Sequence, residues 1–181
     1  IAPQILDLET GTYDTDVDVA SFDPDSVERV PAPENLSKIV DLPAKIKVFQ
    51  LMEDGDVTML ILPVRGQGLW GPMLGYLALD ADTDTIKGLT FYAHKETPGL
   101  GAEVDNPKWK QLWPDRKVTD ADGKVAIRVV KGVAKAPELE NKVDGISGAT
   151  LTCRGVSNLL HFWLSEDGYG PYLKNFKAGQ V

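Results

Sequence analysis

Lys45-Ile46-Lys47-Val48-Phe49-Gln50-Leu51 opens a stretch, residues 45–64, from which the class of fold follows. This first run alternates polar and apolar residues with a period of two, which predicts a half-buried β-strand. The residues Glu53-Asp54-Gly55-Asp56 tolerate tight turns, and residues 57–64 return to apolar and β-branched types. The stretch therefore predicts an antiparallel β-hairpin.

The rest of the chain toward the C-terminus continues this pattern. Residues 73–79 and 86–93 predict a second hairpin around the acidic turn 80–84. Helices are predicted over residues 106–113, from Thr150 to about Ser165, and near the C-terminus. Hairpins followed by late helices are typical of an α+β fold, here a twisted, mainly antiparallel sheet with helices packed on it.

The first 43 residues are acidic and contain three prolines between Pro24 and Pro33. Because they show no clear periodicity, we expect an extended arm with one short helix near residues 25–29. The sequence thus predicts an arm over residues 1–43 and a single domain over residues 44–181.

Bulk composition limits the possible classes of protein. With 181 residues, of which 43% are apolar, the chain can bury one core. A formal charge of −8 argues against a nucleic-acid partner. No apolar run approaches the roughly 20 residues that span a bilayer. Cys153 is the only cysteine, so an internal disulfide is excluded.

A loop rich in small residues precedes the long C-terminal helix, with the sequence Asp144-Gly145-Ile146-Ser147-Gly148-Ala149-Thr150. A helix start presents unpaired backbone N–H groups and the positive end of a dipole, which favours a phosphate ligand. The alternative is an ordinary helix capped by Ser147 after a small-residue turn.

Two other motifs predict structure rather than ligand sites. Residues 66–71 fit the string G-x-G-x-x-G, but Pro72 and a β-like run follow instead of the helix that dinucleotide binding requires. Residues 80–84 start like a calcium loop, yet Thr85 and Phe91 stand where glycine and glutamate are needed. We predict a glycine-rich connection and a solvated turn.

No metal site is predicted. His94 and Glu96 would share one face of a strand, but two ligands do not make a metal site. The chain has one other histidine, His161, far along on the last long helix.

Three stretches together carry a family resemblance. The motif Asp144–Thr150 resembles the flavinylation motif of the FMN-binding domain family, in which a flavin transferase joins FMN to the last threonine through a phosphoester. Residues 94–101, His94-Lys95-Glu96-Thr97-Pro98-Gly99-Leu100-Gly101, resemble a second signature of that family, and residues 68–73 a third. The tail over residues 162–173 also fits. The motifs are more similar to the C subunits of Na+-translocating NADH:quinone reductases than to the G subunits of Rnf complexes.

The resemblance implies a set of cofactor-binding residues. Thr150 would carry covalent FMN, and Asp144 would brace its loop or help bind a magnesium–FAD complex during attachment. The phosphate would be steadied by Ser147, Gly148, Ala149 and Leu151, and the flavin ring would contact Glu96, Thr97, Gly99, Leu100, Leu69 and Trp70.

The resemblance also implies a function in a complex. The chain would be an electron-transfer subunit of a membrane Na+-translocating NADH:quinone reductase, and it would not be catalytically complete alone. It would work with the other subunits of the reductase complex and with a flavin transferase during maturation. A helix before Ile1 would anchor it in the bacterial inner membrane, with the domain facing the periplasm. Three alternatives stay open: the G subunit of an Rnf-type ferredoxin:NAD complex, a noncatalytic flavin-binding or assembly module, and a soluble reductase acting on a small organic acid.

Overall fold

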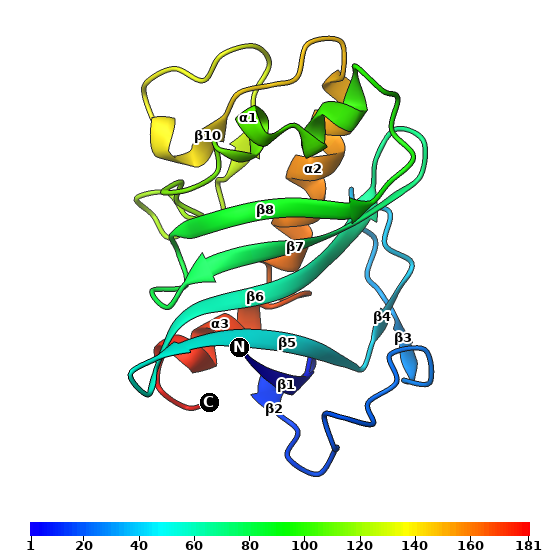
Figure 1. Cartoon of the computed structure of the whole chain (residues 1–181), viewed down its shortest axis with the longest axis vertical. Helices are drawn as coiled ribbons and strands as arrows, with labels where there is room; N and C mark the ends of the chain where they lie inside the picture. The colour runs from blue at the N-terminus through cyan, green and yellow to red at the C-terminus, as the bar shows by residue number, and fades with distance from the viewer.

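The computed structural model describes all residues 1–181 and is built around one six-stranded sheet (Figure 1). Its strand order is β2-β1-β5-β6-β7-β8, and every neighbouring pair is antiparallel. This confirms the predicted α+β class with a twisted, mainly antiparallel sheet. The strands of this sheet are β1 (Ala2–Asp7), β2 (Thr12–Tyr13), β5 (Lys45–Glu53), β6 (Asp56–Gln67), β7 (Pro72–Asp80) and β8 (Ile86–Ala93).

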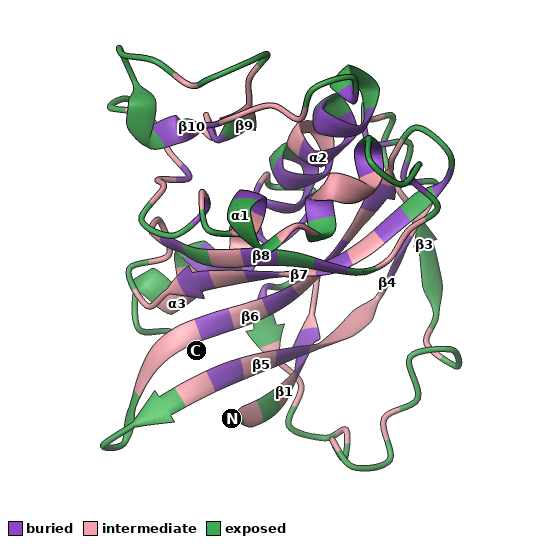
Figure 2. Cartoon of the chain, turned by 45° about the horizontal axis from the view of Figure 1, so that its top comes forward, coloured by how far each residue is buried: buried purple, intermediate pink, exposed green.

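The hairpin predicted over residues 45–64 is present as β5 and β6. Phe49 pairs with Ile61 across the two strands, and the turn places Asp54 and Gly55 at φ of 53° and 94°. Glycine accepts such left-handed backbone without steric cost, which is why the chain reverses at this point. The strand ends beside this turn are exposed (Figure 2).

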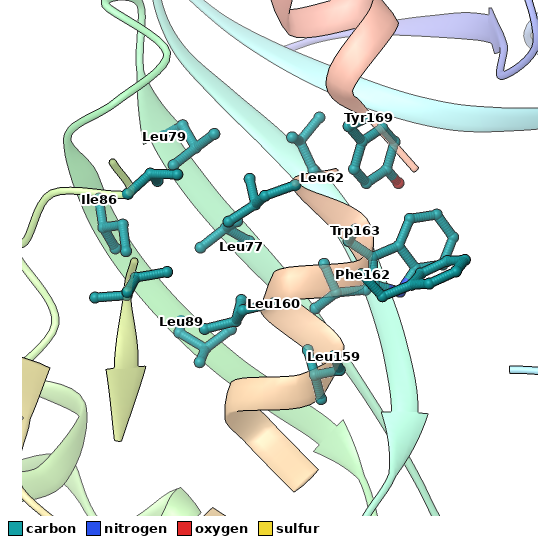
Figure 3. Close-up of a cluster of buried hydrophobic side chains, with 14 of the residues drawn as sticks. Leu62, Leu77, Leu79, Ile86, Leu89, Leu159, Leu160, Phe162, Trp163 and Tyr169 are labelled. Atoms are coloured by element: carbon teal, nitrogen blue, oxygen red, sulfur yellow. The ribbon is translucent and has the colours of Figure 1, made fainter. Parts of the chain in front are cut away.

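The core lies between the sheet and helix α2 (Thr150–Trp163). Figure 3 shows Leu62 and Leu77 of the sheet facing Leu160 of α2, with Trp163 and Tyr169 closing one end. The alternation along β6 and β7 sends every second side chain to this face, which is buried. The helix therefore crosses the sheet on one side, passing behind β6 to β8 in Figure 1.

The first seven residues differ from the prediction of irregular structure. Ala2–Asp7 pairs with β5 along its whole length, and Ile5 and Leu6 are 1% and 0% exposed. The sequence offers little sign of this strand, since two adjacent buried residues do not alternate and the partner strand lies some 40 residues away. The boundary at residue 43 stays a prediction.

The smaller elements correct two further predictions. The helix expected near residues 25–29 is wrong: these residues form turns and bends that lead into strand β3 (Arg29–Pro31). The helix predicted over residues 106–113 is shorter than expected, since the α-helix spans only residues 107–110. None of the helices has the length and apolar content that a membrane crossing requires. The other elements are β4 (Asp41–Pro43), η1 (Gly101–Asp105), α1 (Pro107–Lys110), β9 (Arg128–Val129), η2 (Leu139–Asn141), β10 (Lys142–Val143) and α3 (Gly170–Lys177).

The acidic turn between β7 and β8 is held by the Asp82 carboxylate, as the solvated-turn prediction requires. Asp82 accepts the backbone N–H groups of Asp84 at 2.8 Å and Thr85 at 2.7 Å, and the Thr85 hydroxyl at 2.5 Å. Partial burial raises the pKa of Asp82, but these donors and Lys117 outweigh it and lower the pKa from 3.8 to about 2.

We expect Asp82→Asn to reduce the acid sensitivity of the fold. A folded-state pKa below the unfolded value contributes stability that is present above 3.8 and lost as pH falls through about 2. The free energy of unfolding, measured in urea, should therefore fall more for the wild-type chain than for Asp82→Asn as the pH is lowered from about 4 to about 2. Asp122→Asn, in another exposed turn where the carboxylate accepts no hydrogen bond, is the matched control and should follow wild type. Parallel stability curves for all three chains would contradict the prediction.

Candidate functional site

Thr150 is the first residue of α2, and its side chain is exposed. The residue before it, Ala149, is the N-cap and provides no side-chain hydrogen bond, so the alternative of a helix capped by Ser147 is wrong. The helix begins here because Gly148 takes φ of 73°, a left-handed turn that redirects the chain. The start of α2 thus combines an exposed hydroxyl with backbone N–H groups that no side chain caps.

The Glu96 carboxylate connects three segments around this hydroxyl. It is 5% exposed and accepts the Trp70 backbone N–H at 3.0 Å and the Thr152 hydroxyl. A side chain at Gly101 would place its Cβ 2.5 Å from Thr152 Oγ1 and 2.7 Å from Glu96 Oε2, so only glycine fits there. Glu96 therefore fixes the loop after β8 and the β6–β7 connection against the first turn of α2.

Large apolar side chains lie exposed in these same segments. Leu69, Trp70, Leu100 and Leu151 are 42%, 62%, 42% and 51% exposed. The Trp70 indole N–H donates to Thr97 Oγ1 at 3.1 Å, which joins the two loops. Soluble chains rarely gather such side chains without a ligand or partner to cover them.

Leu100 connects the exposed apolar side chains with the loop that precedes α2. A Cβ built on Gly148 would lie 2.9 Å from Leu100 Cδ2, so the Leu100 side chain reaches the loop that precedes Thr150. Gly99, at φ of 75°, has no atom within 4 Å of such a Cβ and leaves its side of the loop open.

A cleft of about 650 Å³ opens on the other side of Thr150. One wall is the segment 128–133, another is the loop 144–148, and the floor is one face of α2 from Thr150 to His161. Asp144 holds the walls together: its side chain accepts the Ala134 N–H at 2.9 Å, and its carbonyl accepts the Trp109 indole N–H at 2.9 Å. These two hydrogen bonds are those that a loop-bracing role of Asp144 requires.

Cys153 lines the cleft floor but is 5% exposed. Burial raises the pKa of its thiol, and the Ile146 N–H that donates to Sγ at 3.3 Å opposes this only partly. Because the thiolate is the reactive form, we expect iodoacetamide to modify native Cys153 at pH 8 at least about tenfold more slowly than the urea-unfolded chain. Time-resolved mass spectrometry measures both rates, and equal rates would contradict the prediction.

The structure thus brings most of the sequence-predicted residues into one region. Trp70 is joined to Glu96 and Thr97 by hydrogen bonds, and Leu69 precedes it in the same connection. The Leu100 side chain reaches the loop 144–151. The sequence analysis assigned no role to Thr152, whose hydroxyl donates to Glu96. Its hydroxyl, two residues after Thr150, was the available signal.

Comparison with known proteins relates the candidate site to an established family. The profile of the FMN-binding domain family matches residues 68–165, which include both loops and the start of α2. The C subunit of the Na+-translocating NADH-quinone reductase of Pseudomonas aeruginosa is 42% identical over 190 aligned positions, covering 100% of this chain and 73% of that protein. The corresponding C subunit from Yersinia pestis is 40% identical and is covered over 70% of its length.

Solved structures show the same fold. The crystal structure of NqrC from Shewanella oneidensis superposes with a TM-score of 0.90 at 35% identity, covering 98% of this chain and 84% of that one. The C subunit from Parabacteroides distasonis gives a TM-score of 0.71 at 29% identity, covering 96% and 77% of the two chains. The chain therefore belongs to the FMN-binding domain family, and within it to the group of C subunits of Na+-translocating NADH-quinone reductases.

Proposed function

We propose that the chain is a covalently flavinylated electron-transfer domain, with FMN linked through its phosphate to Thr150 Oγ. The coarser part of the proposal, that the chain is an FMN electron-transfer subunit of the Na+-translocating NADH-quinone reductase, is supported by the family and by the names of the relatives. The threonine linkage is the finer part of the proposal. It is supported above all by an exposed threonine hydroxyl at a helix start that no side chain caps.

The residues around Thr150 fit a flavin nucleotide. The N–H groups at the start of α2 favour the phosphate charge, and the exposed Ser147 hydroxyl lies in the same loop. Leu69, Trp70, Leu100 and Leu151 offer apolar surface to a planar ring. Thr97, Gly99, Gly148 and Ala149 complete the proposed set, with Glu96 and Asp144 acting through the loops that they brace.

FMN, when bound, supplies the one- and two-electron redox chemistry, and the protein supplies binding and orientation. Glu96 fixes the two loops against α2, so that the apolar side chains are held in place before the ring arrives. Trp70 and Thr97 are locked to each other by their hydrogen bond. A covalent bond would keep the carrier from dissociating and would fix its local concentration near redox partners.

The proposal extends to the surroundings of the domain. We place it at the bacterial inner membrane, facing the periplasm, among the other subunits of the reductase and matured by a flavin transferase. The names of the relatives, which specify one subunit of a sodium-translocating reductase, support the membrane and the partner subunits of this placement. In this arrangement the chain relays electrons and is not a complete catalyst alone. The boundary at residue 43 belongs to the same proposal, with strand β1 (Ala2–Asp7) of the segment 1–43 joining the sheet of the domain 44–181.

Peptide mapping of the wild-type chain tests the linkage. After coexpression with a flavin transferase, we expect a fluorescent band that survives denaturing electrophoresis and a mass excess of FMN minus water on the Thr150 peptide. A colourless chain of unmodified mass would overturn the linkage and favour a noncatalytic flavin-binding or assembly module. The same chain made without the transferase is the control and should lack the excess.

A further inference from the structure

The cleft beside Thr150 is lined by basic residues to which the proposed function assigns no role. Its ionisable lining contains three basic residues, Arg128, Lys131 and Arg154, against one carboxylate, Asp144, with His161 at the far end. The chain as a whole has a formal charge of −8. A local excess of cations in an acidic protein marks this cleft as a place where an anion is stabilised.

The cations of the cleft are poorly neutralised by the protein itself. The Arg128 guanidinium lies 4.0 Å from Glu138 Oε2, at the limit of an ion pair. Lys131 and Arg154 have no carboxylate oxygen within 4.0 Å. The Asp144 carboxylate accepts the Ala134 N–H at 2.9 Å and forms no ion pair with either of them.

Arg154 is placed to reach a group on Thr150. The two residues are four apart on α2, which puts their Cβ atoms roughly 5–6 Å from each other on one helix face. Side chains on a helix lean toward its N-terminus, and the exposed Arg154 lines the same cleft as Thr150. Lys131 faces the same space from the opposite wall.

We propose that Arg154, assisted by Lys131, forms a preformed anion site for the phosphate group of the flavin nucleotide. This inference deepens the proposed function and rests on it, since it assigns the residues that position the phosphate for attachment to Thr150. A guanidinium presents a planar pair of N–H donors that match two phosphate oxygens, and it stays charged at any physiological pH. The site exists before any covalent bond forms, so noncovalent binding reveals it.

The test uses unmodified chain made in cells without a flavin transferase. FMN and riboflavin, which differ by the phosphate, are titrated into it and binding is followed by flavin fluorescence and calorimetry. We expect FMN to bind more tightly than riboflavin, and Arg154→Gln to weaken FMN binding about tenfold while leaving riboflavin binding unchanged. Arg154→Lys should retain part of the difference, because it keeps the charge and loses the paired donors.

Lys174→Gln on α3, an exposed lysine outside the cleft, is the matched control and should bind both ligands as wild type does. Equal binding of FMN and riboflavin to wild type, or an Arg154→Gln chain that keeps the preference for FMN, would overturn the inference. A failed linkage looks different: FMN would still be preferred in these titrations, while coexpression with the transferase would leave the Thr150 peptide unmodified.

Discussion

Thr150→Ala is expected to abolish covalent flavin completely. The phosphoester needs a side-chain oxygen at the start of α2, and alanine removes it without disturbing the helix, because the Thr150 side chain is exposed and alanine is the best helix former. After coexpression with a flavin transferase, intact mass and in-gel fluorescence should show full occupancy in wild type and none in the variant.

The matched control for this loss is Thr90→Ala, which removes another exposed threonine hydroxyl, on β8, that accepts only from Lys110 Nζ at 3.0 Å. It should keep the flavin. The circular dichroism and urea midpoint of Thr150→Ala should stay close to wild type, so that the loss reports chemistry and not unfolding. Denaturation-resistant flavin on the Thr150→Ala chain would refute the linkage.

Glu96→Ala is expected to destabilise the fold by about 3 kcal/mol, because it leaves a buried hydroxyl and a part-buried backbone N–H without an acceptor. The Trp70 N–H and the Thr152 hydroxyl both depend on this carboxylate, and Thr152 is 1% exposed. The two loops would then lose their attachment to α2. Urea unfolding measures the free energy of unfolding, and flavin occupancy after coexpression should fall with it.

Two companion chains make this prediction specific. Glu53→Ala, at an exposed position beside the β5–β6 turn, should change the free energy of unfolding by no more than about 0.5 kcal/mol. Combining Thr152→Val with Glu96→Ala should cost less than the two single losses added together, since both remove the same hydrogen bond. Strict additivity, or a Glu96→Ala chain as stable as Glu53→Ala, would contradict the role given to this carboxylate.

Local patterns predicted much of the architecture. Period-two alternation with turn-forming residues identified both hairpins, β5–β6 and β7–β8, and the helix predicted from Thr150 to about Ser165 is present as α2. These features depend on residues close together in the chain, where side-chain type and backbone preference set the conformation. The prediction failed over residues 2–7, because a lone short strand takes its stability from a partner that is distant in sequence.

The order of amino acids was enough to predict the class of fold, the loop that ends at Thr150 and the family of the chain. How these parts meet became visible only in the folded molecule. Folding places the Glu96 carboxylate on a hydroxyl 56 residues away and on a backbone N–H 26 residues away. It also brings the wall of residues 128–133 over the face of α2 that carries Arg154. Hydrogen bonds and charges act over a few ångströms of space, whatever the number of residues between them, so only the folded chain reveals which of them interact.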